Sequence, residues 1–171
     1  MPRIGLLSDS HGRASTTCRA VQLLLEQDVD LLIHLGDVGT VEVIDALAVH
    51  RPGEDQQIPA HLVFGNTDWD IQTLDDYAQE LHIQVDHPVG RLTWGATTLV
   101  FCHGHQNQPM EDALNEKATY LCHGHTHCAA DTRQGATRIL NPGALFRAQA
   151  YTVAVLDTDA DAVTFHTVND H

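Results

Sequence analysis

The feature that most constrains this 171-residue chain is a series of potential metal ligands, each placed directly after an apolar run. The ends of α/β strands commonly carry such side chains, because ligands bind in these folds outside the carboxyl ends of the strands. Five separated motifs of this kind therefore predict one pocket built from loops over a sheet. The motifs are Asp9-Ser10-His11, Gly36-Asp37, Gly65-Asn66-Thr67-Asp68, His103-Gly104-His105 and Gly124-His125-Thr126-His127.

Hydrophobic periodicity predicts alternating strands and helices in the first half of the chain. Apolar residues at four-three-four spacing from Ala14 to Leu25 predict an amphipathic helix. Thr40 is a suitable N-cap for a second helix that carries Val41, Ile44 and Leu47. Prolines and polar residues predict a surface loop over residues 50–59, and residues 70–88 are also expected to be loop. Strands are predicted over residues 3–8, 31–35 and 61–64.

The pattern changes in the second half, where strands outnumber helices. Residues 91–94 and 97–102 predict a hairpin around Gly95-Ala96, and residues 109–117 predict a short helix with Pro109 in its first turn. Further strands are predicted over residues 119–122, 138–141, 151–157 and 163–168. Parallel α/β pairing is expected in the first half and antiparallel pairing in the second.

This order of elements favours an α/β (α+β) fold class with two mixed sheets packed face to face and helices outside. We expect a four-layer α/β/β/α sandwich, formed as a single domain over residues 1–171. No linker or low-complexity tract interrupts the sequence.

Composition excludes several classes of partner. Nine Lys and Arg against 23 Asp and Glu give a formal net charge of −14, which argues against long nucleic acid, because its binding depends on neutralising phosphates. The apolar runs are too short to span a bilayer, so no membrane partner is expected. No signal peptide is visible after Met1, and we expect a cytoplasmic protein.

The cysteines are expected to be small buried hydrophobes in a reducing compartment. This expectation covers Cys18, on the apolar face of the first predicted helix, and also Cys102, Cys122 and Cys128. A structural zinc site formed by Cys122, Cys128 and nearby histidines is the alternative. We do not favour it, because the same histidines fit better into the cluster described above.

Each candidate ligand has an ordinary explanation when taken alone. An Asp before a turn is usually a turn or cap residue, and a lone His is usually hydrogen-bonded. Taken together, the ordered set of two carboxylates, one amide and four imidazoles suits a pair of borderline divalent cations. Asp37, which follows a glycine, is the choice for a carboxylate that bridges both ions. The metal ligands are predicted to be Asp9, His11, Asp37, Asn66, His103, His125 and His127.

The motif series, followed by Asn141-Pro142-Gly143, resembles the calcineurin-like metallophosphoesterase superfamily. More narrowly, it is similar to the small bacterial and archaeal phosphodiesterases of that group. The resemblance covers nearly the whole chain and implies the same four-layer sandwich. It further implies that Asp37 is shared between two ions, one also held by Asp9, His11 and His127 and the other by Asn66, His103 and His125.

The activity implied is hydrolysis of small phosphodiesters by a two-metal mechanism, with a metal-bridging hydroxide as nucleophile. Manganese is the expected metal, and iron, nickel or zinc are alternatives. His105 is the candidate for a catalytic role near the leaving group, although a surface histidine is an equal alternative. Asp68 is a candidate to hydrogen-bond the loop or orient a ligand, and Arg147 is a candidate to contact phosphate.

Two departures from the family pattern bear on specificity. Thr67 stands where many members carry a histidine that donates a proton, which disfavours strong phosphomonoesterase activity. Ala144 stands where relatives commonly carry serine. The alternatives are a phosphomonoesterase or nucleotidase, a dinucleoside-polyphosphate hydrolase, a nuclease, and a non-catalytic protein-interaction scaffold. Relatives often form homodimers or homotetramers, and a homo-oligomer remains open here.

Overall fold

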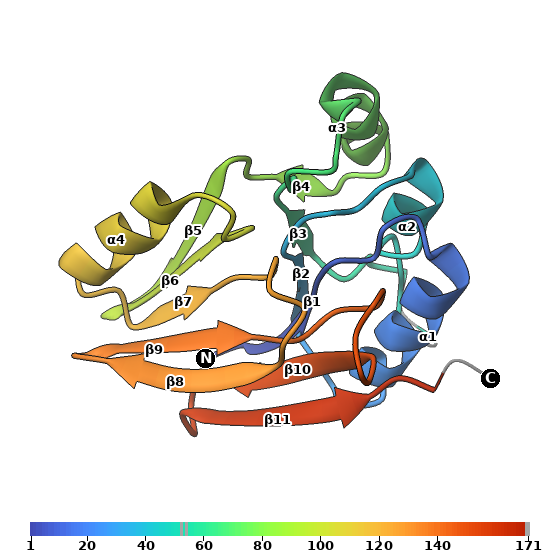
Figure 1. The fold of residues 1–171 in the computed structure, drawn as a ribbon. Coiled ribbons are helices and arrows are strands. Elements are labelled where there is room, and N and C mark those ends of the chain that lie inside the picture. Colours follow the sequence, from blue (N-terminus) through green and yellow to red (C-terminus); the bar gives the residue numbers. More distant parts are fainter. Residues whose placement is uncertain (52, 54, 170–171) are drawn as a thin grey trace.

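Two mixed sheets pack face to face in the computed structural model, which describes residues 1–51, 53 and 55–169 (Figure 1). The first sheet has six strands in the order β11-β10-β1-β2-β3-β4. Strands β1 to β4 are parallel, whereas β10 and β11 are antiparallel additions at one edge. The bounds are β1 Arg3–Leu7, β2 Leu31–His34, β3 Ala60–Leu62, β4 Gln84–Val85, β10 Thr152–Asp157 and β11 Ala162–Thr167.

The second sheet has five strands in the order β5-β6-β7-β9-β8. Strands β6, β7 and β9 are parallel, and antiparallel β5 and β8 form the edges. The expectation of purely antiparallel pairing in the second half was therefore wrong, because α4 (Asn107–Asn115) provides a crossover from β6 to β7. The bounds are β5 Val89–Trp94, β6 Thr97–Cys102, β7 Tyr120–Cys122, β8 Ala130–Gln134 and β9 Thr137–Asn141.

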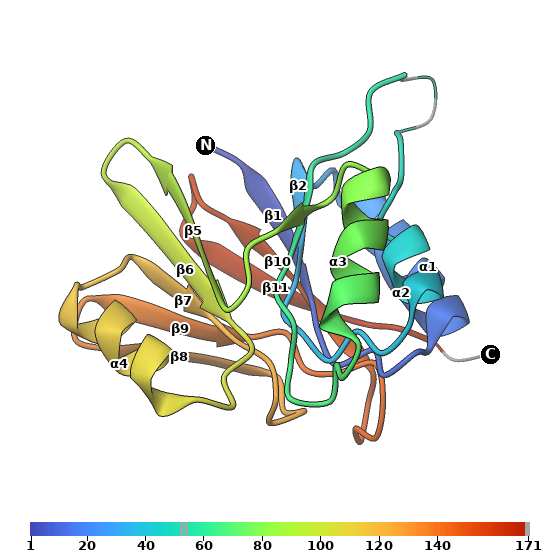
Figure 2. The same ribbon diagram turned by 90° about the horizontal axis from the view of Figure 1, so that it is seen from above.

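The helices lie on the two outer faces, which gives the expected four layers (Figure 2). Helices α1 (Ala14–Leu25), α2 (Val41–Asp45) and α3 (Ile71–Glu80) cover the first sheet, and α4 covers the second. Buried apolar side chains form a separate cluster in each of the three interlayer spaces. The expected α/β sandwich of two mixed sheets is confirmed.

Strand β1 shows how the sequence directs this layering. Successive side chains of a strand point to opposite faces, so Ile4 and Leu6 enter the cluster between the sheets while Leu7 packs with the helices. All of these positions are fully buried. A strand that is buried on both faces has a nearly continuous apolar sequence, as seen here.

The segment over residues 70–88 was expected to be loop, and this expectation was wrong. It contains α3 and β4. Asp70 is the N-cap of α3, and its carboxylate accepts a hydrogen bond from the Thr73 N–H at 3.4 Å. Leu74 and Ala78 pack this helix against the core of the first sheet. The edge strand β8 was not predicted, because its residues are almost all exposed and carry no apolar alternation.

Two local expectations also need correction. Helix α2 ends at Asp45, earlier than expected. Thr40 is its N-cap residue, as predicted, although its side chain makes no capping hydrogen bond within the described part of the chain. Cys102 and Cys122 are buried as expected, but Cys18 and Cys128 are exposed. Cys18 therefore does not lie on the buried side of α1.

The loop over residues 50–59 is confirmed for its described positions, where His50 and Gln57 form an isolated bridge. Its Pro52 and Glu54 lie outside the described residues. Among the described residues, no helix has the length and apolar character needed to cross a membrane.

Candidate metal centre

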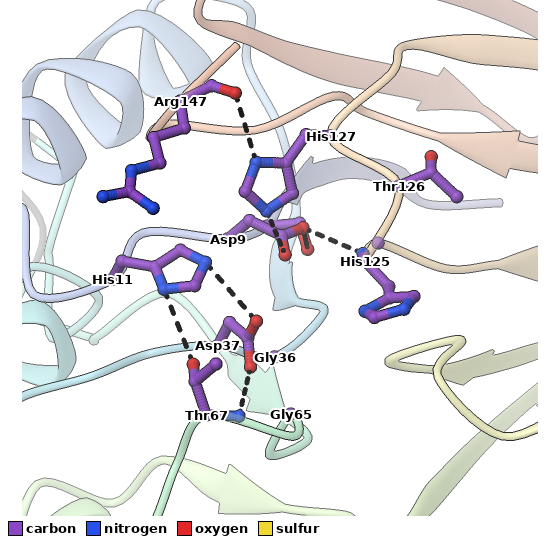
Figure 3. A network of polar contacts seen from close by, with 12 residues as sticks. Asp9, His11, Gly36, Asp37, Gly65, Thr67, His125, Thr126, His127 and Arg147 are labelled. Atoms are coloured by element: carbon purple, nitrogen blue, oxygen red, sulfur yellow. Dashed lines mark hydrogen bonds and ion pairs between the residues drawn. The ribbon is translucent and has the colours of Figure 1, made fainter.

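The predicted ligands come from loops that follow five strands, and these loops meet at one end of the two sheets. The first sheet supplies Asp9 after β1, Asp37 after β2 and Asn66 after β3. The second sheet supplies His103 after β6 and the segment 125–127 after β7. Figure 3 shows the side chains of Asp9, His11, Asp37 and His127 gathered in one cluster. Both sheets therefore contribute to the same site.

The backbone at this cluster adopts conformations that side-chain-bearing residues rarely take. Five of the predicted ligands have positive φ angles: Asp9 (53°), His11 (44°), Asp37 (53°), His125 (67°) and His127 (58°). Each such residue costs about 1–3 kcal/mol, and strain of this kind concentrates at functional sites. The sharp turns aim side chains of sequential residues at a common point.

Two glycines allow the carboxylates to approach other loops closely. A Cβ atom on Gly65 would lie 2.1 Å from Asp37 Oδ1 and 2.5 Å from the Asp37 backbone nitrogen. A Cβ atom on Gly124 would lie 1.9 Å from Ser8 Oγ and 2.6 Å from Asp9 Oδ2. Neither contact is compatible with a side chain, so these glycines are steric requirements of the site.

His103 directs one ring nitrogen toward two oxygen atoms. Its Nδ1–H donates to the Leu35 carbonyl at 2.8 Å, which turns Nε2 toward the site. That Nε2 lies 3.1 Å from Asn66 Oδ1 and 3.4 Å from Asp37 Oδ2. A metal-binding histidine usually donates the N–H of its outer nitrogen to a carbonyl or carboxylate, which fixes the orientation of the ring.

His11 and His127 repeat this arrangement around the two carboxylates. His11 Nε2 lies 3.4 Å from Asp37 Oδ2, and His127 Nε2 lies 3.2 Å from Asp9 Oδ1. Their Nδ1 atoms face outward, toward Thr67 Oγ1 at 3.5 Å and the Arg147 carbonyl at 3.4 Å (Figure 3). Asp37 Oδ2 thus lies between His11 and His103, as a bridging carboxylate would.

The donor atoms form two compact groups that share Asp9, namely Asp9, His11, His127 and Asp9, Asp37, His103. Within each group the atoms lie within 4.8 Å of one another. Asp9 Oδ1 and His11 Nε2 are buried and have no hydrogen-bond partner among the described residues. Buried polar atoms normally make hydrogen bonds, so inward-facing atoms of these types that have only ion-pair contacts fit divalent cations. Neither group includes a cysteine, and the alternative zinc site gains no support from the described residues.

The acid–base properties of the cluster agree with cation binding. Burial acts to raise the pKa of the Asp37 carboxyl, but hydrogen bonds from His103 and Thr67 outweigh it and hold that pKa below its usual range. Burial likewise acts to lower the pKa of His103, but its contacts with Asp37 and Leu35 raise it overall. Positive charge next to the Asp37 carboxylate is therefore favoured at this position, and a bound cation would supply it in place of a proton.

His125 and His105 lie at the border of the cluster. The His125 backbone N–H donates to Asp9 Oδ2 at 3.0 Å, while its ring lies 5.2 Å from the His103 ring. The ring of His105 lies 5.4 Å from that of His103 and is exposed. Burial, followed by the neighbouring His103 and His125, lowers the pKa of His105.

Asp68 holds the loops in place. Its carboxylate accepts hydrogen bonds from the N–H groups of Val38 (3.1 Å), Gly39 (2.8 Å) and Gly65 (2.8 Å). It therefore links the loops that carry Asp37 and Asn66. Of the two roles considered for Asp68, hydrogen bonding to the loop and orienting a ligand, these contacts support the first.

Asn141 has a similar role on the second sheet. The side-chain amide of Asn141 donates to the Gly124 carbonyl at 2.9 Å and to Thr126 Oγ1 at 3.0 Å, and its oxygen accepts from Gly143 N–H at 2.9 Å. This buried residue fixes the turn that carries His125 and His127, and the Asn-Pro-Gly motif was its signal in the sequence.

The sequence analysis missed one supporting residue, His34. The ring is fully buried, its Nδ1 accepts from Gly36 N–H at 3.2 Å, and its Nε2–H therefore donates to Ser10 Oγ at 2.8 Å. His34 thus connects the loops that carry Asp9 and Asp37. Its signal was a histidine at the end of an otherwise apolar strand.

His34 should make the folded protein sensitive to acid. Burial lowers its pKa to about 3 from the usual 6.5, so between these values only the unfolded chain binds the proton. Stability should therefore fall as pH drops below 6.5, by about 1.4 kcal/mol for each pH unit, until about pH 3. Urea unfolding of metal-stripped wild type and His34→Leu, at several pH values, measures this slope.

His34→Leu should lower stability at pH 7 by about 2–4 kcal/mol, since it leaves Ser10 and Gly36 without a partner, and should show a shallower acid slope. Ser10→Ala removes only one of these bonds and should cost less. An unchanged slope in His34→Leu would assign the acid sensitivity to other groups.

One aromatic ring and two guanidinium groups form a cluster beside His11. The Phe146 ring is 4.9 Å from that of His11, and the guanidinium carbons of Arg13 and Arg147 lie 5.2 Å and 5.0 Å from the Phe146 centroid. In Figure 3 the Arg147 side chain extends away from Asp9. A direct contact of Arg147 with substrate phosphate therefore remains a hypothesis.

Comparison with known proteins identifies the family of this chain. The family model of the calcineurin-like phosphoesterase superfamily domain matches residues 2–161. The chain is 27% identical to YsnB, a probable metallophosphoesterase of Bacillus subtilis, over 94% of this chain and 88% of that protein. It is 22% identical to a phosphodiesterase of Methanocaldococcus jannaschii, over 92% of this chain and 93% of that one.

The fold also matches solved structures. A novel archaeal phosphodiesterase superposes with a TM-score of 0.83 at 20% identity, covering 96% of this chain and 99% of that chain. On the family match over nearly its whole length, this chain belongs to the calcineurin-like phosphoesterase superfamily.

Proposed function

We propose that this protein is a divalent-metal-dependent phosphoesterase that hydrolyses small phosphodiesters at a site for two ions. The observation that carries the proposal is the set of three imidazoles whose inner nitrogens face Asp9 or Asp37 while their outer nitrogens face protein oxygen atoms. Bound cations would supply Lewis acidity toward water and phosphate. The names of the two related proteins support this chemistry.

The residues have distinct roles in this proposal. Asp9, His11, Asp37 and His127 would hold one ion, and Asp37, Asn66, His103 and His125 the other. Asp37, between His11 and His103, would keep the ions at a fixed separation. Manganese is the preferred metal, with iron, nickel or zinc as alternatives, because imidazoles and carboxylates together suit all of them.

His105 is the proposed group at the leaving-group side. It is exposed beside His103 and His125, where a substrate oxygen could reach it. Its lowered pKa means that it is mostly neutral at pH 7 and would orient the departing group by a hydrogen bond. Thr67, whose N–H donates to Asp37, offers no comparable acid, which supports diesters over monoesters.

Residues of both sheets build this site, which supports the single domain expected over residues 1–171. Of the candidate partners, small phosphate esters fit best, because a formal net charge of −14 opposes the binding of long nucleic acid. A protein-interaction scaffold would not need the strained, inward-facing ligand set.

Metal analysis followed by a hydrolysis panel tests the proposal. Purified protein should contain manganese, iron, nickel or zinc, lose activity with a chelator and regain it on addition of Mn²⁺. Bis(p-nitrophenyl) phosphate should be hydrolysed faster than p-nitrophenyl phosphate. Preference for the monoester would favour the phosphomonoesterase alternative, and a protein that binds metal without turnover of any ester would favour the scaffold.

A further inference from the structure

A pocket of about 300 Å³ lies beside the metal centre, between the start of α2 and the start of α3. Thr40 and Glu42 line it on the α2 side, Asp70 and Thr73 on the α3 side, and Thr67 and Trp69 lie on the loop between β3 and α3. The Tyr77 hydroxyl of α3 donates to Asp45 of α2 at 2.6 Å and connects the two helices that form its walls.

Thr67 belongs to both the pocket and the metal centre. Its N–H donates to Asp37 Oδ1 at 2.9 Å, and its hydroxyl faces His11 Nδ1 at 3.5 Å (Figure 3). A phosphate held by ions at Asp37 would therefore lie next to the opening of the pocket. One ester group of a bound diester could extend into it.

Trp69 gives the pocket a flat aromatic surface. Its side chain is 89% exposed, although large apolar groups are normally buried. The preceding Asp68 is buried and accepts three backbone hydrogen bonds, so the base of this exposed ring is held firmly. A ring that is fixed at its base and open on its face is suited to stacking.

The charges of the pocket select among ligands. Glu42 and Asp70 contribute carboxylates, and within the described part of the chain no Lys or Arg lines the pocket. Such a pocket repels phosphate and accepts N–H donors. An aliphatic chain would leave these acceptors unpaired, and a quaternary ammonium group prefers a cage of several rings. A planar heterocycle with amino groups can both stack on the Trp69 ring and donate hydrogen bonds to the carboxylates of Glu42 and Asp70.

We propose that this pocket binds the base of a nucleoside that forms one ester group of the substrate, with the base stacked on Trp69 and its N–H groups directed to Glu42 or Asp70. The inference rests on the proposed phosphodiesterase function and narrows its substrate class to small nucleotide diesters.

A binding experiment tests the pocket independently of turnover. Trp94→Phe leaves Trp69 as the one tryptophan of the chain, and its fluorescence is titrated with adenosine 5′-monophosphate or ribose 5-phosphate in the presence of Mn²⁺. The nucleotide should quench Trp69 and bind about tenfold more tightly than the sugar phosphate, because base stacking on an aromatic residue has this effect. Equal affinity of the two ligands would overturn the proposal.

Kinetics with matched esters test the same pocket during turnover. Trp69→Ala should raise KM for adenosine 5′-(methyl phosphate) about tenfold and leave KM for butyl methyl phosphate unchanged. Trp69→Phe should retain most of the affinity. Ile71→Ala, an exposed neighbour outside the pocket, is the control.

Three outcomes would count against the inference: equal loss for both esters, tighter binding of choline phosphate than of the nucleotide, or conversion of a dimer to a monomer by Trp69→Ala. Selective nucleotide binding without hydrolysis of any ester would instead refute the phosphodiesterase function and leave the pocket assignment standing.

Discussion

Replacement of Asp37 by asparagine should reduce metal-dependent hydrolysis of bis(p-nitrophenyl) phosphate by about a thousandfold or more. The Asp37 carboxylate is the group that lies 3.4 Å from both His11 and His103. An amide of the same shape lacks the charge that holds cations, and metal-ion stabilisation of transition-state charge amounts to several kcal/mol. Kinetics with Mn²⁺ and metal analysis of the variant measure the loss.

Asp76→Asn is a suitable control, because this aspartate lies exposed on α3 and pairs only with Gln72 in the described structure. It should retain full activity and metal content. Circular dichroism should show that both variants are folded. If the Asp37→Asn protein keeps its metal and half of its activity, Asp37 is not a metal ligand.

Gly65→Ala should abolish most activity although it changes no ligand. The new Cβ would meet the Asp37 carboxylate at 2.1 Å and the Asp37 backbone at 2.5 Å, so the loop that carries Asp37 must move. A displacement of about an ångström at a catalytic group typically costs about a hundredfold in rate. We expect metal affinity to fall as well, which isothermal titration with Mn²⁺ would show.

Gly135→Ala is the matched control for Gly65→Ala. Its Cβ would meet nothing within 4 Å, but φ is +59°, so the substitution adds backbone strain far from the site. It should lower stability by about 1 kcal/mol and leave kinetics unchanged. If both variants lose activity equally, general destabilisation rather than displacement of Asp37 explains the effect.

The sequence predicted the site and the buried strands where potential metal ligands directly follow apolar runs. The ordered ligand motifs predicted which loops would meet, and apolar runs such as residues 31–33 identified the buried strands. The close approach of Asp9 and Asp37 could be expected because they follow the neighbouring parallel strands β1 and β2, whose ends lie side by side. His103 joins them from the other sheet.

Other features depended on tertiary contacts and could not be predicted in the same way. The exposed strand β8 is defined by pairing with β9 and has no apolar pattern of its own. His34 gains its role only because Ser10 and Gly36 fold onto it. Helix α3 is different, since its Asp70 cap and the spacing of Leu74 and Ala78 were present in the sequence and were overlooked.

The divided origin of the ligands has a mechanical consequence. Asp9 and Asp37 follow strands of one sheet and His103 and His127 follow strands of the other, so the distance between donor groups depends on how the apolar layer between the sheets is filled. A thinner or thicker layer would change the separation between the donor groups of the first sheet and those of the second. The apolar layer between the sheets would thereby set the size of the proposed metal site.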